Sequence, residues 1–242
     1  IINRRTMILN VTLDSENSQA LRPQLEGFVE ALPDAVVDRK VWTPVSLPVN
    51  EGLTIPAQVN YVGKGANLYD LGYELHGSVN VITNYLRTTW LWEKIRVQGG
   101  AYGAFNSFNK ETGTFTFLSY RDPNFARTLE TYDNAASFLR TTDLNQDELT
   151  KSIIGAIGSL DAYQLPDAKG FTSMVRYLVG KSDEERQQLR DEVLGTTVSD
   201  FRAFADALEQ VAQEGQVVVM GSSDTVAKAN DPEAWLEVLS IA

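Results

Sequence analysis

The sequence predicts an α+β fold in which helices pack on one face of a mainly antiparallel sheet. Segments with strand character predict the sheet, and they lie at 6–13, 56–62, 101–108, 114–120 and 217–220. Between the last two of these segments, apolar residues recur at helical spacing over a long stretch. The predicted order is therefore strand, helix, strand, helix, two strands, several helices and a final strand. This grouping of strands and helices is typical of an α+β protein.

A strand and a helix are predicted at the start of the chain. Residues 6–13 (TMILNVTL) alternate apolar and polar side chains at period two, which predicts a half-buried strand. Asp14 or Ser15 can cap the helix that follows, and Pro33 ends it. The buried stripe of this helix is predicted to comprise Ala20, Leu21, Leu25, Phe28, Val29 and Leu32.

The next segment, 33–56, is predicted to be an extended connector. It contains four prolines and little periodicity, as connecting segments often do. A free linker would be more polar, so we expect this one to pack down through Val41, Trp42, Val45, Leu47 and Val49. Residues 1–242 are therefore predicted to form a single domain with a packed connector at about 33–56.

Two strong local signals organise the middle of the chain. Apolar residues at helical spacing predict a helix over about 72–92, and Gly99-Gly100 stops it, because glycine favours the backbone conformation just past a helix end. The segments 101–108 and 114–120 then alternate as strands around a short polar turn, which predicts a hairpin.

Capping residues mark the helices of the second half. Three pairs have the spacing of helix starts: Asp122 with Pro123, Asn145 with Glu148, and Ser182 with Glu185. The run Val217–Met220 is apolar throughout, which predicts a central strand after the helices.

Composition excludes several classes of function. The 21 basic and 32 acidic residues give a net charge of −11, so the phosphate backbone of nucleic acid would be repelled. The chain has no cysteine, and its lone histidine, His76, cannot form a two-histidine metal motif, so no metal site is predicted in it. No apolar run reaches the ~20 residues that span a bilayer, so no membrane association is expected. The chain opens without an initiator methionine, and we expect it to be a piece of a longer protein.

Common catalytic patterns are weak in this sequence. His76 is interpreted as an ordinary polar residue near a helix start. Gly63-Lys64-Gly65 follows a strand but lacks the spacing of a phosphate-binding loop. The acidic pairs lie at helix N-termini, where capping and the helix dipole already explain them.

The segment from Leu91 to Gly103 (LWEKIRVQGGAYG) is more informative. Arg96 lies near a helix end, two glycines follow, and Tyr102 opens a strand. A guanidinium can hold carbonyl or carboxylate oxygens, and a phenol can donate to an oxyanion that develops during a reaction. Alternatively, Arg96 pairs with an acidic neighbour and Tyr102 fills the core.

Three long runs resemble a known family, the C-terminal domain of presequence proteases in the pitrilysin/insulin-degrading-enzyme group of zinc metallopeptidases. They are EGLTIPAQVNYVGKGANLY (51–69), LRTTWLWEKIRVQGGAYGAF (86–105) and FTFLSYRDPNFARTLETYD (115–133). The resemblance covers most of the chain, is strongest over 50–140, and presents its motifs in the same order.

The resemblance implies a clamshell of four α+β domains whose two halves enclose a chamber. Zinc, bound through an inverted HxxEH motif, would lie in the first domain, and the last domain would face it. The arginine and tyrosine that the last domain contributes match Arg96 and Tyr102, which would hold substrate and stabilise the transition state. Gly99, Gly100 and Gly103 would border the bound substrate.

On this interpretation the cofactor is zinc in the N-terminal catalytic domain, and the partners are the N-terminal half of the same polypeptide and peptide substrates. The chain alone would be inactive. Bacterial cytoplasm, mitochondrial matrix and plastid stroma all fit the resemblance. An alternative is a non-catalytic structural or assembly module of the same superfamily. An independent hydrolase lacks any complete catalytic set.

Overall fold

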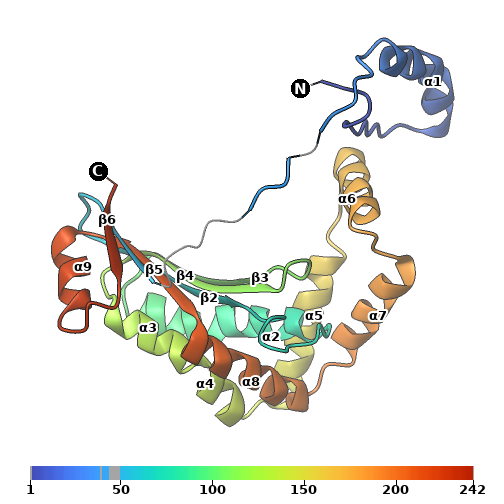
Figure 1. The fold of residues 1–242 in the computed structure, drawn as a ribbon. Helices are drawn as coiled ribbons and strands as arrows, with labels where there is room; N and C mark the ends of the chain where they lie inside the picture. Colours follow the sequence, from blue (N-terminus) through green and yellow to red (C-terminus); the bar gives the residue numbers. More distant parts are fainter. Residues whose placement is uncertain (1, 39, 44–49, 242) are drawn as a thin grey trace. The chain divides into compact units, whose positions relative to one another are not determined.

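The computed structural model describes residues 2–38, 40–43 and 50–241 (Figure 1). The chain divides into two compact units. The first consists of Ile1–Ser46 and Ala162–Glu185, and the second of Leu47–Asp161 and Arg186–Ala242. That residues 1–242 form one domain with a packed connector at about 33–56 stays a prediction. Its residues Pro44, Val45, Leu47, Pro48 and Val49 lie outside the described residues.

The second unit is built on a six-stranded sheet in the order β3-β4-β2-β5-β1-β6. The four strands from β3 to β5 pair antiparallel, whereas β5, β1 and β6 pair parallel. The prediction of a mainly antiparallel sheet is therefore confirmed. The strands are β1 (Glu51–Thr54), β2 (Asn60–Asn67), β3 (Gly103–Phe108), β4 (Thr114–Asp122), β5 (Gln216–Gly221) and β6 (Glu237–Ser240). The predicted hairpin and the central strand β5 are both present, and β1 occupies the end of the segment expected to be a connector.

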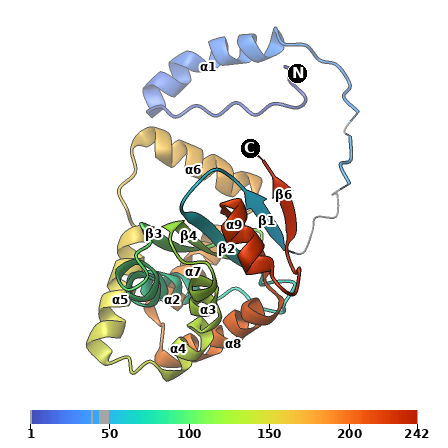
Figure 2. The same ribbon diagram turned by 90° about the vertical axis from the view of Figure 1, so that its left-hand side faces the viewer.

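Helices cover one face of this sheet, as predicted. In Figure 1, α2, α3, α4 and α8 lie below the strands, and Figure 2 shows the same helices from the side. The helices of this unit are α2 (Val79–Leu86), η1 (Arg87–Val97, a π-helix), α3 (Ala126–Asp133), α4 (Ala135–Thr141), α5 (Gln146–Leu160), α8 (Val198–Glu214) and α9 (Ser223–Asn230); α7 (Asp183–Leu194) belongs to both units.

Aromatic side chains fill the core between the sheet and these helices. Phe117 of β4 stacks on Tyr132 of α3 at 4.9 Å between ring centroids, and Phe115 contacts Phe117 edge-on at 4.8 Å. The Tyr132 hydroxyl donates a hydrogen bond to the carbonyl oxygen of Val62 at 3.2 Å. Burial raises the pKa of Tyr132, which keeps the phenol neutral and able to donate.

Two of the three sequence signals for helix starts are confirmed. The pair Asp122–Pro123 is wrong as a helix start, because Asp122 ends β4 and α3 begins at Ala126 after Phe125. Asn145 and Glu148 form a reciprocal capping box at the start of α5. Ser182 and Glu185 exchange the same two hydrogen bonds before α7. These caps satisfy backbone N–H groups that a helix leaves free at its first turn.

The first unit contains α1 (Ser15–Glu30) and α6 (Pro166–Leu178). Asp14 caps α1 by accepting a hydrogen bond from the Asn17 amide at 2.9 Å, as predicted. The strand predicted at 6–13 is wrong, because the structure assigns no strand there. Alternating apolar and polar side chains fit a strand, but a strand also needs a neighbouring strand to hydrogen-bond with its backbone. No described strand pairs with this segment.

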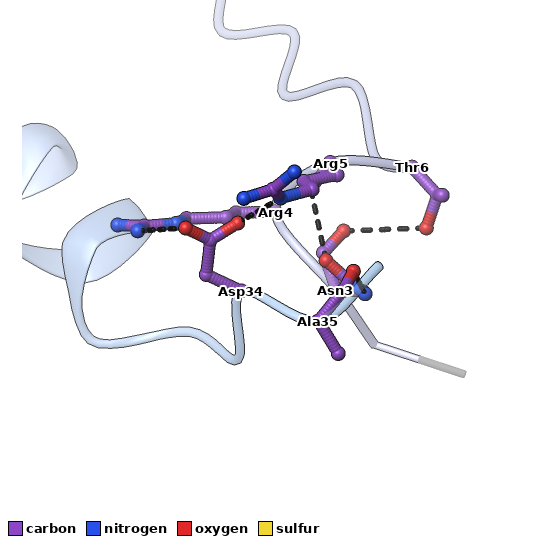
Figure 3. A network of polar contacts seen from close by, with 6 residues as sticks. All are labelled: Asn3, Arg4, Arg5, Thr6, Asp34 and Ala35. Atoms are coloured by element: carbon purple, nitrogen blue, oxygen red, sulfur yellow. Dashed lines mark hydrogen bonds and ion pairs between the residues drawn. The ribbon is translucent and has the colours of Figure 1, made fainter. Parts of the chain in front are cut away.

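A polar network holds the residues before this segment to those after α1 (Figure 3). The buried side chain of Asn3 donates to the carbonyl oxygen of Ala35 at 2.7 Å and accepts from the Arg5 amide at 3.0 Å. Asp34 forms ion pairs with Arg4, at 2.5 Å, and with Arg5. Hydrogen bonds from these two guanidinium groups hold the pKa of the Asp34 carboxyl below its usual range.

Replacing Asp34 by asparagine is expected to loosen this network. Because the pKa of Asp34 is lowered on folding, the ionised carboxylate stabilises the network above pH ~4, the ordinary value, and this contribution is lost as pH falls below it. In D34N at neutral pH, amide exchange at Arg4 and Thr6 should be roughly two- to fivefold faster. Hydrogen exchange by NMR measures this.

The matched control is Asp38→Asn, which removes an exposed carboxylate from the same segment. Equal exchange rates at Arg4 and Thr6 in wild type and D34N would contradict a stabilising role for the two ion pairs.

Candidate functional site

The candidate site lies where a helix of unusual geometry meets the hairpin. α2 continues directly into η1, and the Gln98 amide donates to the Glu93 carbonyl oxygen at 2.9 Å, which is the five-residue spacing of a π-helix. Such helices are rare and are frequent at functional sites. The helix predicted over 72–92 therefore begins later, at Val79, and continues to Val97.

Two glycines make the turn from η1 to β3. Gly100 has φ +79°, a left-handed conformation that side chains disfavour. A Cβ on Gly99 would lie 2.4 Å from the Ile95 carbonyl oxygen, so only glycine fits there. The Ala101 amide donates to that same oxygen at 3.1 Å and closes the turn. These glycines therefore let Arg96 and Tyr102, six positions apart in the sequence, remain in contact.

Arg96 is held by two contacts. Its Nε donates to the Tyr102 carbonyl oxygen at 3.1 Å, and its guanidinium carbon lies 4.0 Å from the centre of the Trp92 ring. Within the described part of the chain, no carboxylate lies at ion-pair distance from Arg96. The alternative in which Arg96 pairs with an acidic neighbour is therefore wrong.

Tyr102 faces solvent. The residue is 69% exposed, so the alternative in which it fills the core is also wrong. Its backbone amide donates to the Tyr120 carbonyl oxygen at 3.1 Å, which aligns it with β4, and its ring meets the Tyr120 ring edge-on at 5.8 Å. No described residue hydrogen-bonds to the Tyr102 hydroxyl. Gly103 follows as the buried first residue of β3.

The structure thus brings Arg96 and Tyr102 together and places Gly99, Gly100 and Gly103 in the backbone around them. It adds two side chains that sequence reasoning missed. Trp92 could have been found from its four-residue separation from Arg96 on a helix, whereas Tyr120 depends on the hairpin register, which places it opposite Gly103.

The described residues do not fit a zinc site. His76 is the sole histidine, and its Nδ1 lies 2.8 Å from the Ser78 hydroxyl. No three histidine, cysteine, aspartate or glutamate side chains gather as a metal-ligand group in the described parts of the chain. What the site offers is hydrogen-bond donors: one phenol and the terminal nitrogens of one guanidinium.

The fold is that of M16 peptidase domains. The peptidase M16 inactive domain from Pseudomonas fluorescens superimposes with a TM-score of 0.60 at 16% identity, over 87% of this chain and 52% of that one. Pitrilysin superimposes with a TM-score of 0.58 at 15% identity, over 93% of this chain and 25% of that one. At these identities the likeness concerns the fold alone.

Sequence comparison defines the family. Residues 50–224 match the PreP C-terminal domain. Presequence protease 1, chloroplastic/mitochondrial, of Arabidopsis thaliana is 45% identical over 232 residues, which are 96% of this chain and 22% of that protein. Protein HypA of Clostridium perfringens is 29% identical over 231 residues, 96% of this chain and 24% of that protein. The chain belongs to the PreP C-terminal domain family, and it spans less than a quarter of these relatives.

Among its described helices, none has the length and apolar character needed to cross a membrane.

Proposed function

We propose that this chain is the substrate-binding C-terminal domain of a zinc metalloendopeptidase that degrades peptides in a closed chamber. The zinc and its ligands would belong to the N-terminal catalytic half of the same polypeptide, and bacterial cytoplasm or an organelle matrix or stroma would be its compartment. One observation carries the proposal: Arg96 and Tyr102 touch each other at an exposed turn and keep hydrogen-bond donors that no described residue uses.

The two side chains would each donate a hydrogen bond to a different carbonyl group of the bound peptide. The Tyr102 hydroxyl would donate to the carbonyl oxygen of the bond being cleaved as negative charge develops on that oxygen. The Arg96 terminal nitrogens would donate to a neighbouring backbone carbonyl, while its Nε remains on the Tyr102 carbonyl oxygen. Both groups would act as donors in fixed positions, and neither would need to transfer a proton.

Trp92 is expected to position Arg96, because its ring lies under the guanidinium. Replacing Trp92 by alanine in the full-length polypeptide should lower kcat/KM for peptides about three- to fivefold, the value of an exposed cation–π contact. Trp92→Phe keeps an aromatic face and should recover most of the loss. If W92F and W92A are equally impaired, the cation–π contact does not explain the effect.

Mixing this chain with the N-terminal catalytic half of the polypeptide tests the proposed function. The N-terminal half alone and this chain alone should cleave a peptide at background rates, and the mixture should cleave it in a chelator-sensitive reaction. The alternative, a non-catalytic structural module, predicts that the mixture is equally active when this chain carries both Arg96→Ala and Tyr102→Phe. That result would overturn the proposal.

A further inference from the structure

The face of the sheet opposite the core helices carries a group of large apolar side chains, although a solvated face is usually polar. In each strand, alternate side chains point away from α2, α3 and α8, and in four neighbouring strands these positions hold small or polar residues and also large apolar ones. They include Tyr61, Phe105, Leu118, Tyr120, Val218 and Met220. Four of them are 40–47% exposed, so this face is not covered by the second unit's own residues.

Strand register makes these side chains neighbours. Phe105 lies opposite Leu118, and Leu118 lies opposite Gly63, which in turn lies opposite Val218. Residues opposite each other in antiparallel strands share a face, so the apolar surface is continuous from β3 to β5. Contiguous apolar surface of this kind marks an interaction site rather than ordinary scatter.

This surface begins at the candidate site. The Tyr102 ring contacts the Tyr120 ring at 5.8 Å between centroids, and the Tyr120 ring contacts the Tyr61 ring at 5.4 Å, both edge-on. These three tyrosines form an aromatic row that runs from the exposed phenol of Tyr102 onto the sheet. Met220 lies opposite Tyr61 and extends the row by one strand.

We propose that the aromatic row of Tyr102, Tyr120 and Tyr61 is a subsite for an apolar side chain, aromatic or branched aliphatic, of the bound peptide. The inference rests on the proposed function, because it assumes that Arg96 and Tyr102 hold the peptide backbone. A backbone held at Tyr102 presents its next side chain to the neighbouring surface, and that surface is the Tyr120 ring. Ring faces and edges favour apolar groups and offer little to a polar amide.

The test compares two peptides that differ only at the residue beside the cleaved bond, leucine in one and asparagine in the other. In the full-length wild-type polypeptide, kcat/KM should favour the leucine peptide by about tenfold or more. In Tyr120→Ser this ratio should fall at least fivefold, whereas Tyr120→Phe should keep it. Tyr177→Ser is the matched control, because Tyr177 is an exposed tyrosine of α6 outside the row and should leave the ratio unchanged.

Each outcome separates this inference from the function on which it rests. If Arg96→Ala slows cleavage of both peptides but Tyr120→Ser leaves their ratio unchanged, the aromatic row is not a subsite and the proposed function stands. If Arg96→Ala changes neither rate, the proposed function itself fails. If Tyr120→Ser changes only the self-association of the protein, measured by sedimentation, the apolar face is an interface between copies and the subsite is refuted. Thermal melts of Y120S and Y120F should coincide within a few degrees. If both variants lose the preference for the leucine peptide equally, the subsite is also refuted.

Discussion

Tyr102→Phe in the full-length polypeptide is expected to lower turnover of peptides by about 10²–10³-fold, the usual cost of losing one donor to a developing oxyanion. The change removes only the hydroxyl group of Tyr102, a residue that is 69% exposed. The hydroxyl oxygen has no hydrogen-bond partner among the described residues. The loss should therefore appear in kcat, since the hydrogen bond would strengthen in the transition state, while KM changes little. Steady-state kinetics on one peptide measures it.

The control for this variant is Tyr163→Phe, which removes the hydroxyl of another exposed tyrosine, 83% exposed, in the first unit. Thermal unfolding of Y102F should match wild type, because no described residue hydrogen-bonds to the lost oxygen. Wild-type turnover in Y102F would show that the Tyr102 hydroxyl takes no part in the reaction.

Arg96→Ala is expected to lower kcat/KM by about 10²-fold, with much of the loss in KM, because a guanidinium that holds the backbone acts before and during the reaction. The variant also loses the Nε hydrogen bond to the Tyr102 carbonyl oxygen, so the backbone that carries the phenol is less well fixed. Arg96→Lys should restore little, since an ammonium group cannot both stack on Trp92 and donate from a planar fork.

Arg87→Ala is the matched control for Arg96→Ala. Arg87 is an exposed arginine of the same π-helix, and its guanidinium donates to the Asn84 side chain at 2.7 Å, remote in sequence from the hairpin. Activity that falls equally in R87A and R96A would point to damage of the helix rather than loss of a substrate contact.

Much of the fold could be predicted because its signals are local. The hairpin of β3 and β4, the strand β5 and the capped helix α5 each follow from a pattern within a few residues. The segment 6–13 could not be assigned correctly, since pairing depends on a neighbour that the segment itself does not specify. The start of α2 was displaced for a similar reason: the Gly77 amide donates to the Glu192 carboxylate at 2.6 Å, a contact more than a hundred residues away in sequence.

The candidate site was predictable in part. Residue type and spacing single out Arg96 and Tyr102, and the structure adds that they are in contact, with Arg96 half-buried and Tyr102 exposed. The π-helix was not predictable, because its apolar positions also fit an α-helix. The Tyr120 contact depends on which residues face each other across β3 and β4, and that register is fixed only when the hairpin is formed.

In the proposed function, the Tyr102 phenol reaches the carbonyl group of a peptide being cleaved. A structure of the full-length polypeptide with an uncleaved peptide bound measures this directly, as the distance from the Tyr102 hydroxyl oxygen to the carbonyl oxygen of the bond to be cleaved. We predict a hydrogen bond of about 2.7–3.1 Å, with the Arg96 terminal nitrogens on an adjacent carbonyl oxygen. If the peptide is bound but its backbone lies beyond hydrogen-bond distance of the Tyr102 hydroxyl, the proposed role of Tyr102 is wrong.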